Sequence, residues 1–153
     1  MRRAVRGIVR APAWLYRHHL GWLGGRRFLL LTHRGRKTGQ LYETVLEAIH
    51  HDRVTRESIV LSGPGTAGHW YRNIRAAPAV RVQTGRLSYQ PHQRFLTPDE
   101  ARVAASRFVR AHPWDARLVP WILRRLGWLD DTAPCDPAEL LGSLPMVAFR
   151  PND

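Results

Sequence analysis

Two stretches of the sequence combine cations, hydroxyls and glycines in a way that suits an anionic ligand. The first, "RGRKTG", follows the apolar run "FLLL" and contains Lys37, the only lysine of the chain. Arg36, Lys37 and Thr38 offer two cations and a hydroxyl, and Gly39 permits a turn with accessible backbone amides, a set that suits phosphate or carboxylate. Taken alone, this stretch is more typical of a solvated basic turn.

The second stretch, "SGPGTAGHWYRN", is a glycine-rich loop that leads into a short helix. The unpaired amides and the dipole at a helix start attract the anionic end of a ligand. Trp70 and Tyr71 offer aromatic surface for a planar ring. The alternative is structural, because Trp70 and Ile74 are one helical turn apart and would pin the helix to the rest of the protein.

Known phosphate-binding motifs do not account for these stretches. A P-loop has a glycine directly before its lysine and a helix after it, whereas here Arg36 precedes Lys37 and a strand is predicted to follow. The loop glycines match G-x-G-x-x-G literally, but the next helix is only about two turns long. No acidic residue stands near the position about 20 residues further on that would bind a ribose.

The charge and the histidines limit the classes of partner. The formal net charge of +12 attracts anions, yet no nucleic-acid-binding motif is present, so we expect no nucleic-acid partner. The eight histidines include the adjacent pairs 18–19 and 50–51 but form no H-x-x-x-H pattern. We therefore expect no metal site and interpret the histidines as surface residues.

The elements that position the two stretches follow from hydrophobic patterning and turn signals. "TPDE" predicts a helix with Thr97 as its N-cap, running to about residue 111 and followed by a second helical stretch over 114–127. Strands are predicted over 28–32, 42–49, 58–62, 80–84 and 87–95, with a short helix over 69–76. Only this short helix lies between candidate parallel strands, so we expect an α+β fold with a mostly antiparallel β-barrel and helices packed outside.

We expect the 153 residues to form one domain. Its predicted parts are an N-terminal helical segment over 1–25, a barrel core over 28–96, a helical segment over 97–130 and a final strand over 146–150. Arginines interrupt the apolar N-terminal segment and no signal-peptide cleavage site follows, so we expect a cytoplasmic protein. The arginine-rich helix over 3–23 would suit an anionic membrane surface, and the alternative is a helix packed on the barrel.

From Phe28 to Glu100 the chain resembles the deazaflavin-dependent nitroreductase family, oxidoreductases that use coenzyme F420. "LLLTHRGRKTGQ" is similar to that family's "TTGRKTG" or "TTGRKSG", and "HWYRNIRAAPAVRVQ" is similar to its "PxWYxNLxANPxVxVQ". The resemblance implies a split β-barrel of the FMN-binding type. It also implies an enzyme that transfers hydride from reduced deazaflavin to a small electron-poor acceptor such as a nitroaromatic, a quinone or an enone.

The resemblance further implies which residues bind the cofactor. The phosphate and oligoglutamate tail would lie against the turn, and the strand, the glycine-rich loop and the short helix would lie beside the rest of the cofactor. The implied cofactor-binding residues are Arg36, Lys37, Thr38, Gly39, Glu43, Thr44, Val45, Leu46, Ser62, Gly63, Trp70, Tyr71, Arg72 and Asn73.

The C-terminal third departs from the family pattern. The family's acceptor pocket often draws tyrosines from this part, whereas this chain has no tyrosine after Tyr89 and offers Trp114, Trp121 and Trp128 instead. No catalytic residue is therefore assigned. Two alternatives stay open: a split barrel that binds a cofactor or a lipid without turnover, and a reductase that uses FMN. The oligomeric state is not predicted.

Overall fold

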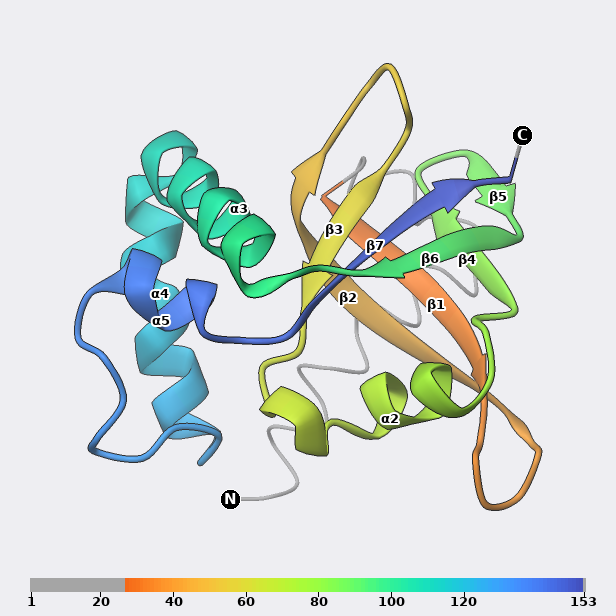
Figure 1. The fold of residues 1–153 in the computed structure, drawn as a ribbon, viewed down its shortest axis with the longest axis horizontal. Helices are drawn as coiled ribbons and strands as arrows, with labels where there is room; N and C mark the ends of the chain where they lie inside the picture. The colour runs from red at the N-terminus through yellow and green to blue at the C-terminus, as the bar shows by residue number, and fades with distance from the viewer. Residues whose placement is uncertain (1–26, 153) are drawn as a thin grey trace.

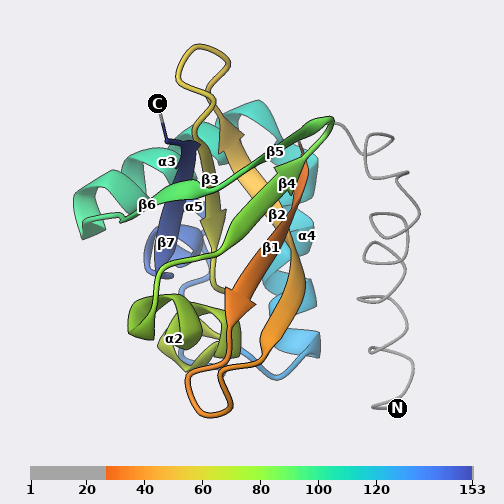
Figure 2. The same ribbon diagram turned by 90° about the vertical axis from the view of Figure 1, so that its right-hand side faces the viewer.

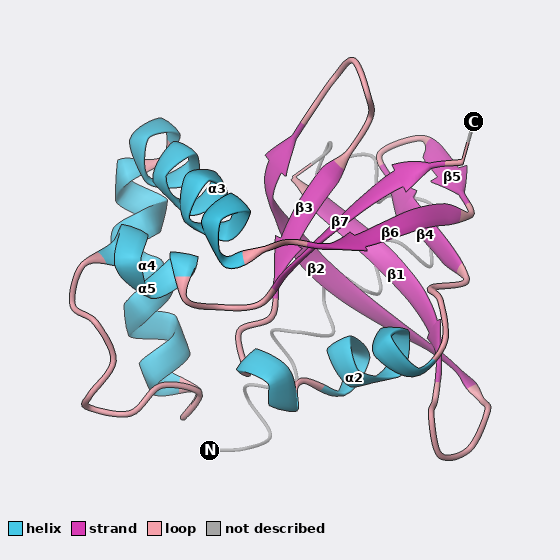
Figure 3. Cartoon of the chain, viewed as in Figure 1, coloured by secondary structure: helices cyan, strands magenta, loops and turns pink. Residues whose placement is uncertain are grey.

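Seven strands form the centre of the computed structural model, which describes residues 27–152 (Figure 1). In chain order they are β1 (Phe28–Arg34), β2 (Leu41–His51), β3 (Ser58–Leu61), β4 (Arg81–Thr84), β5 (Leu87–Tyr89), β6 (Pro91–Phe95) and β7 (Met146–Pro151). Each pairing between them is antiparallel, and their order in the sheet is β5-β4-β1-β2-β3-β7-β6. The sheet curls into a split β-barrel, which confirms the predicted fold class (Figure 3).

Helices cover one side and one end of this barrel. The helices α3 (Pro98–Ala111), α4 (Pro113–Arg125) and α5 (Pro137–Gly142) gather on one side, and α2 (His69–Ala76) lies at the end that carries the β1–β2 turn (Figures 1 and 2). The predicted capping box begins α3. The Thr97 hydroxyl accepts a hydrogen bond from the Glu100 amide, and the Glu100 carboxylate accepts one from the Thr97 amide.

The barrel interior and the helix layer form two apolar clusters on opposite faces of the same strands. In β7, Val147 and Phe149 pack inside the barrel, while Met146 and Ala148 pack against the helices. This division follows from the pleat of a strand, which points successive side chains to opposite faces. Strand β7 is therefore held from both sides.

The structure corrects the prediction of one strand over 87–95. The chain leaves β5, which pairs with β4, and continues as β6, which pairs with β7 at the other edge of the sheet. Pro91 begins β6, a position at which its missing N–H breaks no ladder hydrogen bond. The hairpin around Gly85 therefore includes only the first part of the predicted strand.

The sequence analysis also missed helix α5. Asp136 accepts a hydrogen bond from the Glu139 amide, and Pro137 occupies the first helical position. This "DPAE" start has the same pattern as "TPDE" and could have been recognised. The helix predicted over 3–23 lies outside the described residues. Within residues 27–152, no helix combines the length and the apolar character needed to cross a membrane.

Candidate functional site

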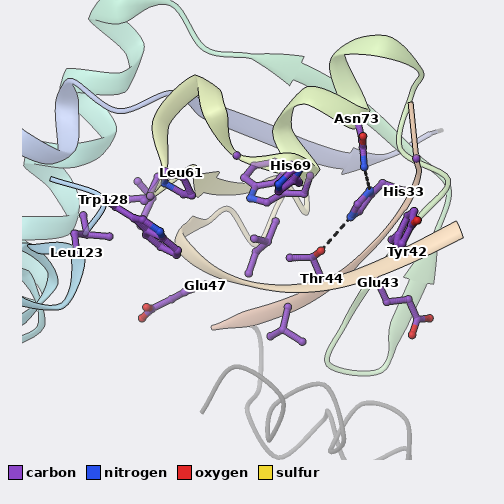
Figure 4. A pocket seen from close by; sticks show the side chains of 18 of the residues that line it. His33, Tyr42, Glu43, Thr44, Glu47, Leu61, His69, Asn73, Leu123 and Trp128 are labelled. Carbon is purple, nitrogen blue, oxygen red and sulfur yellow. Dashed lines mark hydrogen bonds between the residues drawn. The ribbon is translucent and has the colours of Figure 1, made fainter. Parts of the chain in front are cut away.

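A pocket of about 760 Å³ lies beside an edge of β2 that has no strand partner (Figure 4). β1 pairs with β2 from Leu41 to Glu47, whereas β3 pairs with β2 only from Ala48 onward. Among the described residues, no strand pairs with the second edge of β2 before Ala48. The pocket is lined by this stretch of β2, the β1–β2 turn, the start of α2 and part of α4.

The β1–β2 turn forms one end of the pocket. The Gly35 amide donates to the Gln40 carbonyl at 2.7 Å, and Gly39, which has a φ of 71°, donates to the Gly35 carbonyl at 2.8 Å. A Cβ atom at Gly35 would lie 2.6 Å from the Tyr42 ring, so only glycine fits there without a shift of the ring. This tight turn brings Arg36 and Lys37 to the pocket wall, with the Lys37 side chain exposed.

A chain of hydrogen bonds joins the turn to α2, β1 and β2. The Arg36 amide and guanidinium donate to Asn73 Oδ1 at 3.2 and 2.9 Å. Asn73 Nδ2 lies 3.0 Å from His33 Nδ1, and His33 Nε2 lies 3.0 Å from Thr44 Oγ1 (Figure 4). His33 is only 3% exposed, and burial lowers its pKa from the ordinary value. The interpretation of the histidines as surface residues is therefore wrong for His33.

The opposite end of the pocket is mainly apolar, with the Glu47 carboxylate also in its lining. Leu61, Leu123 and Trp128 lie there, with Phe108, Val119 and Ile122 also among the lining residues (Figure 4). The Trp128 indole packs on Gly63, because a Cβ atom at Gly63 would lie 2.6 Å from Trp128 Cε3. The segment around Trp128 thus contacts the glycine-rich loop through a glycine that has no side chain to block it.

The pocket brings together most of the residues implied to bind the cofactor. Its lining includes Arg36, Lys37, Thr38, Glu43, Thr44, Val45, Leu46, Gly63, Trp70 and Asn73. Four others are not in the lining: Gly39, Ser62, Tyr71 and Arg72. Ser62 Oγ donates to the Gly65 carbonyl at 2.6 Å, and Tyr71 packs edge-on against Phe95.

The aromatic residues of α2 have a mainly structural role. Trp70, Tyr71 and Ile74 are buried in the cluster inside the barrel, as the structural alternative for the helix predicted. Trp70 also lines the pocket, whereas Tyr71 does not.

Sequence reasoning missed several lining residues. Tyr42 stacks on His33 with 6.1 Å between the ring centroids and 24° between the planes. Tyr42 and Thr44 are two positions apart on β2, so strand alternation could have assigned Tyr42 to the same face. No sequence signal connected His33 with Asn73, which lies 40 residues away.

Comparison with known proteins adds an independent result. The family model described as F420H(2)-dependent quinone reductase matches residues 8–115, more than half of the chain. A solved structure of an F420-H2 dependent reductase (FDR-A) is 22% identical, with a TM-score of 0.51, and the match covers 82% of this chain and 96% of that one. A second structure, described as a domain-swapped dimer, is 20% identical, with a TM-score of 0.52 and coverage of 82% and 81%.

At these identities the two structures support the fold alone, and the family match supports the function. It confirms the resemblance to deazaflavin-dependent oxidoreductases that "RGRKTG" and "HWYRNIRA" indicated. The chain belongs to the F420H2-dependent quinone reductase family, and the protein is accordingly an oxidoreductase with coenzyme F420 as its cofactor.

Proposed function

We propose that this reductase transfers a hydride from reduced coenzyme F420 to a small electron-poor acceptor, with a quinone as the first candidate. The observation that carries the proposal is one pocket with a basic end and an apolar end, as described above. The anionic tail of a deazaflavin suits the basic end, and an apolar planar acceptor suits the apolar end. Nitroaromatics and enones are alternative acceptors, since they are electron-poor as well.

The residues at the basic end fit the anionic part of the cofactor. Arg36 and Lys37 carry two positive charges, and Thr38 adds a hydroxyl within the same turn. Among the described residues, no acidic side chain forms an ion pair with Lys37, so its charge is available to a ligand. We propose that these three residues hold the phosphate and the oligoglutamate tail, and that Thr44, Leu46, Gly63 and Trp70 lie beside the ring.

The chain's part in the reaction would be to bind the cofactor and the acceptor and to orient them. A reduced deazaflavin held by these residues would supply a hydride, which carries two electrons and one proton. A quinone that takes up this hydride and one further proton from solvent becomes a hydroquinone. Leu61, Leu123 and Trp128 would give the acceptor an apolar wall.

Two measurements test the proposal. Titration of the purified protein with coenzyme F420, followed by the fluorescence of the coenzyme, should give saturable binding that Lys37→Ala weakens. Arg110→Gln, at an exposed position at the end of α3, should bind like the wild type and serves as the matched charge-removal control. Mixing with reduced coenzyme and a quinone should then oxidise the coenzyme at steady state.

The alternatives predict different outcomes of the same experiments. Tight coenzyme binding without turnover across a panel of quinones and nitroaromatics would favour a binding protein. Stronger binding of FMN than of coenzyme F420 would contradict the proposed cofactor use.

The contact with an anionic membrane, expected through residues 3–23, stays a prediction, as does the cytoplasmic location. Flotation with anionic liposomes checks the contact, and equal binding by a chain that lacks residues 1–23 would contradict it.

A further inference from the structure

The hydrogen bonds at the basic end of the pocket have a direction that the amide of Asn73 determines. Asn73 Oδ1 receives two donors, the amide and the guanidinium of Arg36, and neither of these groups can accept a hydrogen bond. A flipped Asn73 would place its NH₂ group against both donors. The carboxamide oxygen therefore faces Arg36, and the NH₂ group faces His33.

This orientation determines which nitrogen of His33 carries the proton. Asn73 Nδ2 is a donor, so His33 Nδ1 must accept and carries no hydrogen. A neutral imidazole then has its single hydrogen on Nε2, which faces Thr44 Oγ1 at 3.0 Å. A doubly protonated ring would set an N–H against the Asn73 amide hydrogens, and burial of His33 also disfavours the charged form.

The tautomer in turn leaves Thr44 as a donor. A hydroxyl has one hydrogen, and Thr44 Oγ1 already accepts from His33, so its own hydrogen is left for another partner. Thr44 lines the pocket, and within the described part of the chain its hydroxyl has no other hydrogen-bond partner. Every hydrogen bond in this chain thus points the same way. Arg36 donates to Asn73, Asn73 donates to His33 and His33 donates to Thr44, which leaves the Thr44 hydroxyl to donate into the pocket.

We propose that His33 is a positioning residue that makes the Thr44 hydroxyl a hydrogen-bond donor to a carbonyl oxygen of the molecule bound beside β2. The proposal rests on the proposed function, because both a deazaflavin ring and a quinone carry carbonyl oxygens. In the proposed direction the quinone accepts the hydride, so it is a quinone oxygen that gains electron density, whereas a deazaflavin carbonyl would only be held in place by the donor. A preoriented donor stabilises that charge without reorganising.

His33 acts in this arrangement by orientation and not as a proton source. If it gave up the Nε2 hydrogen while Nδ1 accepted from Asn73, an imidazolate would be left in a buried site, which is costly. The groups that face the ring are Asn73 from α2 and Thr44 and Tyr42 from β2, with the Arg36 guanidinium behind Asn73. None of these is an acid that would stabilise an imidazolium.

The tautomer is tested in the protein without any ligand. Nitrogen-15 NMR of the histidine rings, with His33 assigned by its loss in His33→Gln, should show a neutral ring with the hydrogen on Nε2 at neutral pH. Asn73→Asp presents an acceptor to Nδ1 and should move a proton there. An Nδ1–H tautomer or an imidazolium in the wild type would overturn the proposal, as would an unchanged spectrum in Asn73→Asp.

The donor role is tested with a pair of nearly isosteric variants. Thr44→Val removes the hydroxyl and keeps the shape, and Thr44→Ser keeps the hydroxyl. Loss of one hydrogen bond should weaken binding or turnover roughly 3- to 10-fold in Thr44→Val, with Thr44→Ser close to the wild type. A weaker fluorescence-measured affinity for coenzyme F420 would assign the carbonyl to the cofactor. A lower kcat/KM for the quinone alone would assign it to the acceptor.

These outcomes separate this proposal from the proposed function. If the wild type binds and turns over while Thr44→Val matches it in both measurements, the donor role is overturned and the function stands. If the wild type binds no coenzyme F420, the proposed function fails and the donor role fails with it, while the NMR result still decides the tautomer of His33.

Discussion

Lys37 lies within the β1–β2 turn and His33 lies four positions before Lys37, near the end of β1, and their surroundings differ. The Lys37 side chain is exposed to solvent, whereas the His33 ring is buried and burial lowers the pKa of His33. Tyr89 is a third case, because its buried hydroxyl has no hydrogen-bond partner among residues 27–152 and burial raises its pKa to about 12. At this scale, the exposure of a side chain decides its chemistry more than its type does.

The buried His33 should make stability depend on pH in the acidic range. Its pKa in the folded protein lies below the ordinary value of 6.5, so the neutral form is stabilised by folding. The stabilisation from the neutral His33 ring is complete above pH 6.5 and is lost as the pH falls below 6.5. Urea unfolding across this range should show a smaller loss of stability in His33→Gln than in the wild type. Equal slopes would contradict the burial of a neutral ring.

Tyr89 should produce the corresponding effect at alkaline pH. Its folded-state pKa of about 12 lies above the ordinary 10.0, so stability should fall as the pH rises from that value toward 12. Tyr89→Phe should lose less stability over the same range when unfolding is followed by circular dichroism. At neutral pH the variant should match or exceed the wild type, by up to about 1 kcal/mol, because the unpaired hydroxyl is removed.

At the scale of elements, the apolar end of the pocket depends on contact between the glycine-rich loop and the segment that follows α4. Gly63 lies under the Trp128 ring, and Leu123 of α4 would lie 3.0 Å from a Cβ atom at Gly63. The loop and α4 are far apart in the sequence but meet at this one glycine.

Gly63→Ala should therefore displace Trp128 and lower the free energy of unfolding by about 1–3 kcal/mol, the usual cost of an overpacked site. Chemical denaturation followed by tryptophan fluorescence measures this change. Trp128→Leu removes the ring that the new methyl group would strike, so the double variant should lose less than the sum of the two single losses. Strict additivity would contradict the contact.

At the scale of the whole molecule, the net charge of +12 and the position of the β1–β2 turn both favour binding of an anionic cofactor. A net positive charge favours the approach of an anionic cofactor at long range, whereas the turn would give the anionic tail a defined place. Long-range attraction is screened by salt, and removal of a cation at the contact should reduce that salt dependence.

Coenzyme affinity should accordingly fall as salt is added, and more steeply for forms with longer oligoglutamate tails. Lys37→Ala should bind roughly 5-fold more weakly at low salt and show a shallower salt dependence. Arg110→Gln should change neither quantity by a comparable amount. The same loss with a coenzyme analogue that lacks the tail would contradict the assignment of Lys37 to the tail. Lys37→Arg tests whether charge alone suffices, since affinity equal to that of the wild type would mean that it does.

Local signals in the sequence predicted much of this protein. The turn glycines, the capping box at Thr97 and the strand alternation predicted most elements correctly, because each depends on contacts within a few residues. The same signals predicted the antiparallel barrel. The resemblance of "RGRKTG" and "HWYRNIRA" to a known family indicated the cofactor.

What the sequence alone did not decide depends on contacts between distant segments. The change of strand partner between β5 and β6, the burial of His33 against Asn73 and the packing of Trp128 on Gly63 each join residues far apart in the chain. Local propensity does not encode which distant surfaces meet. Only the curled sheet and its helix layer bring them together, because burial of the apolar faces selects one arrangement among the many that the local pattern allows.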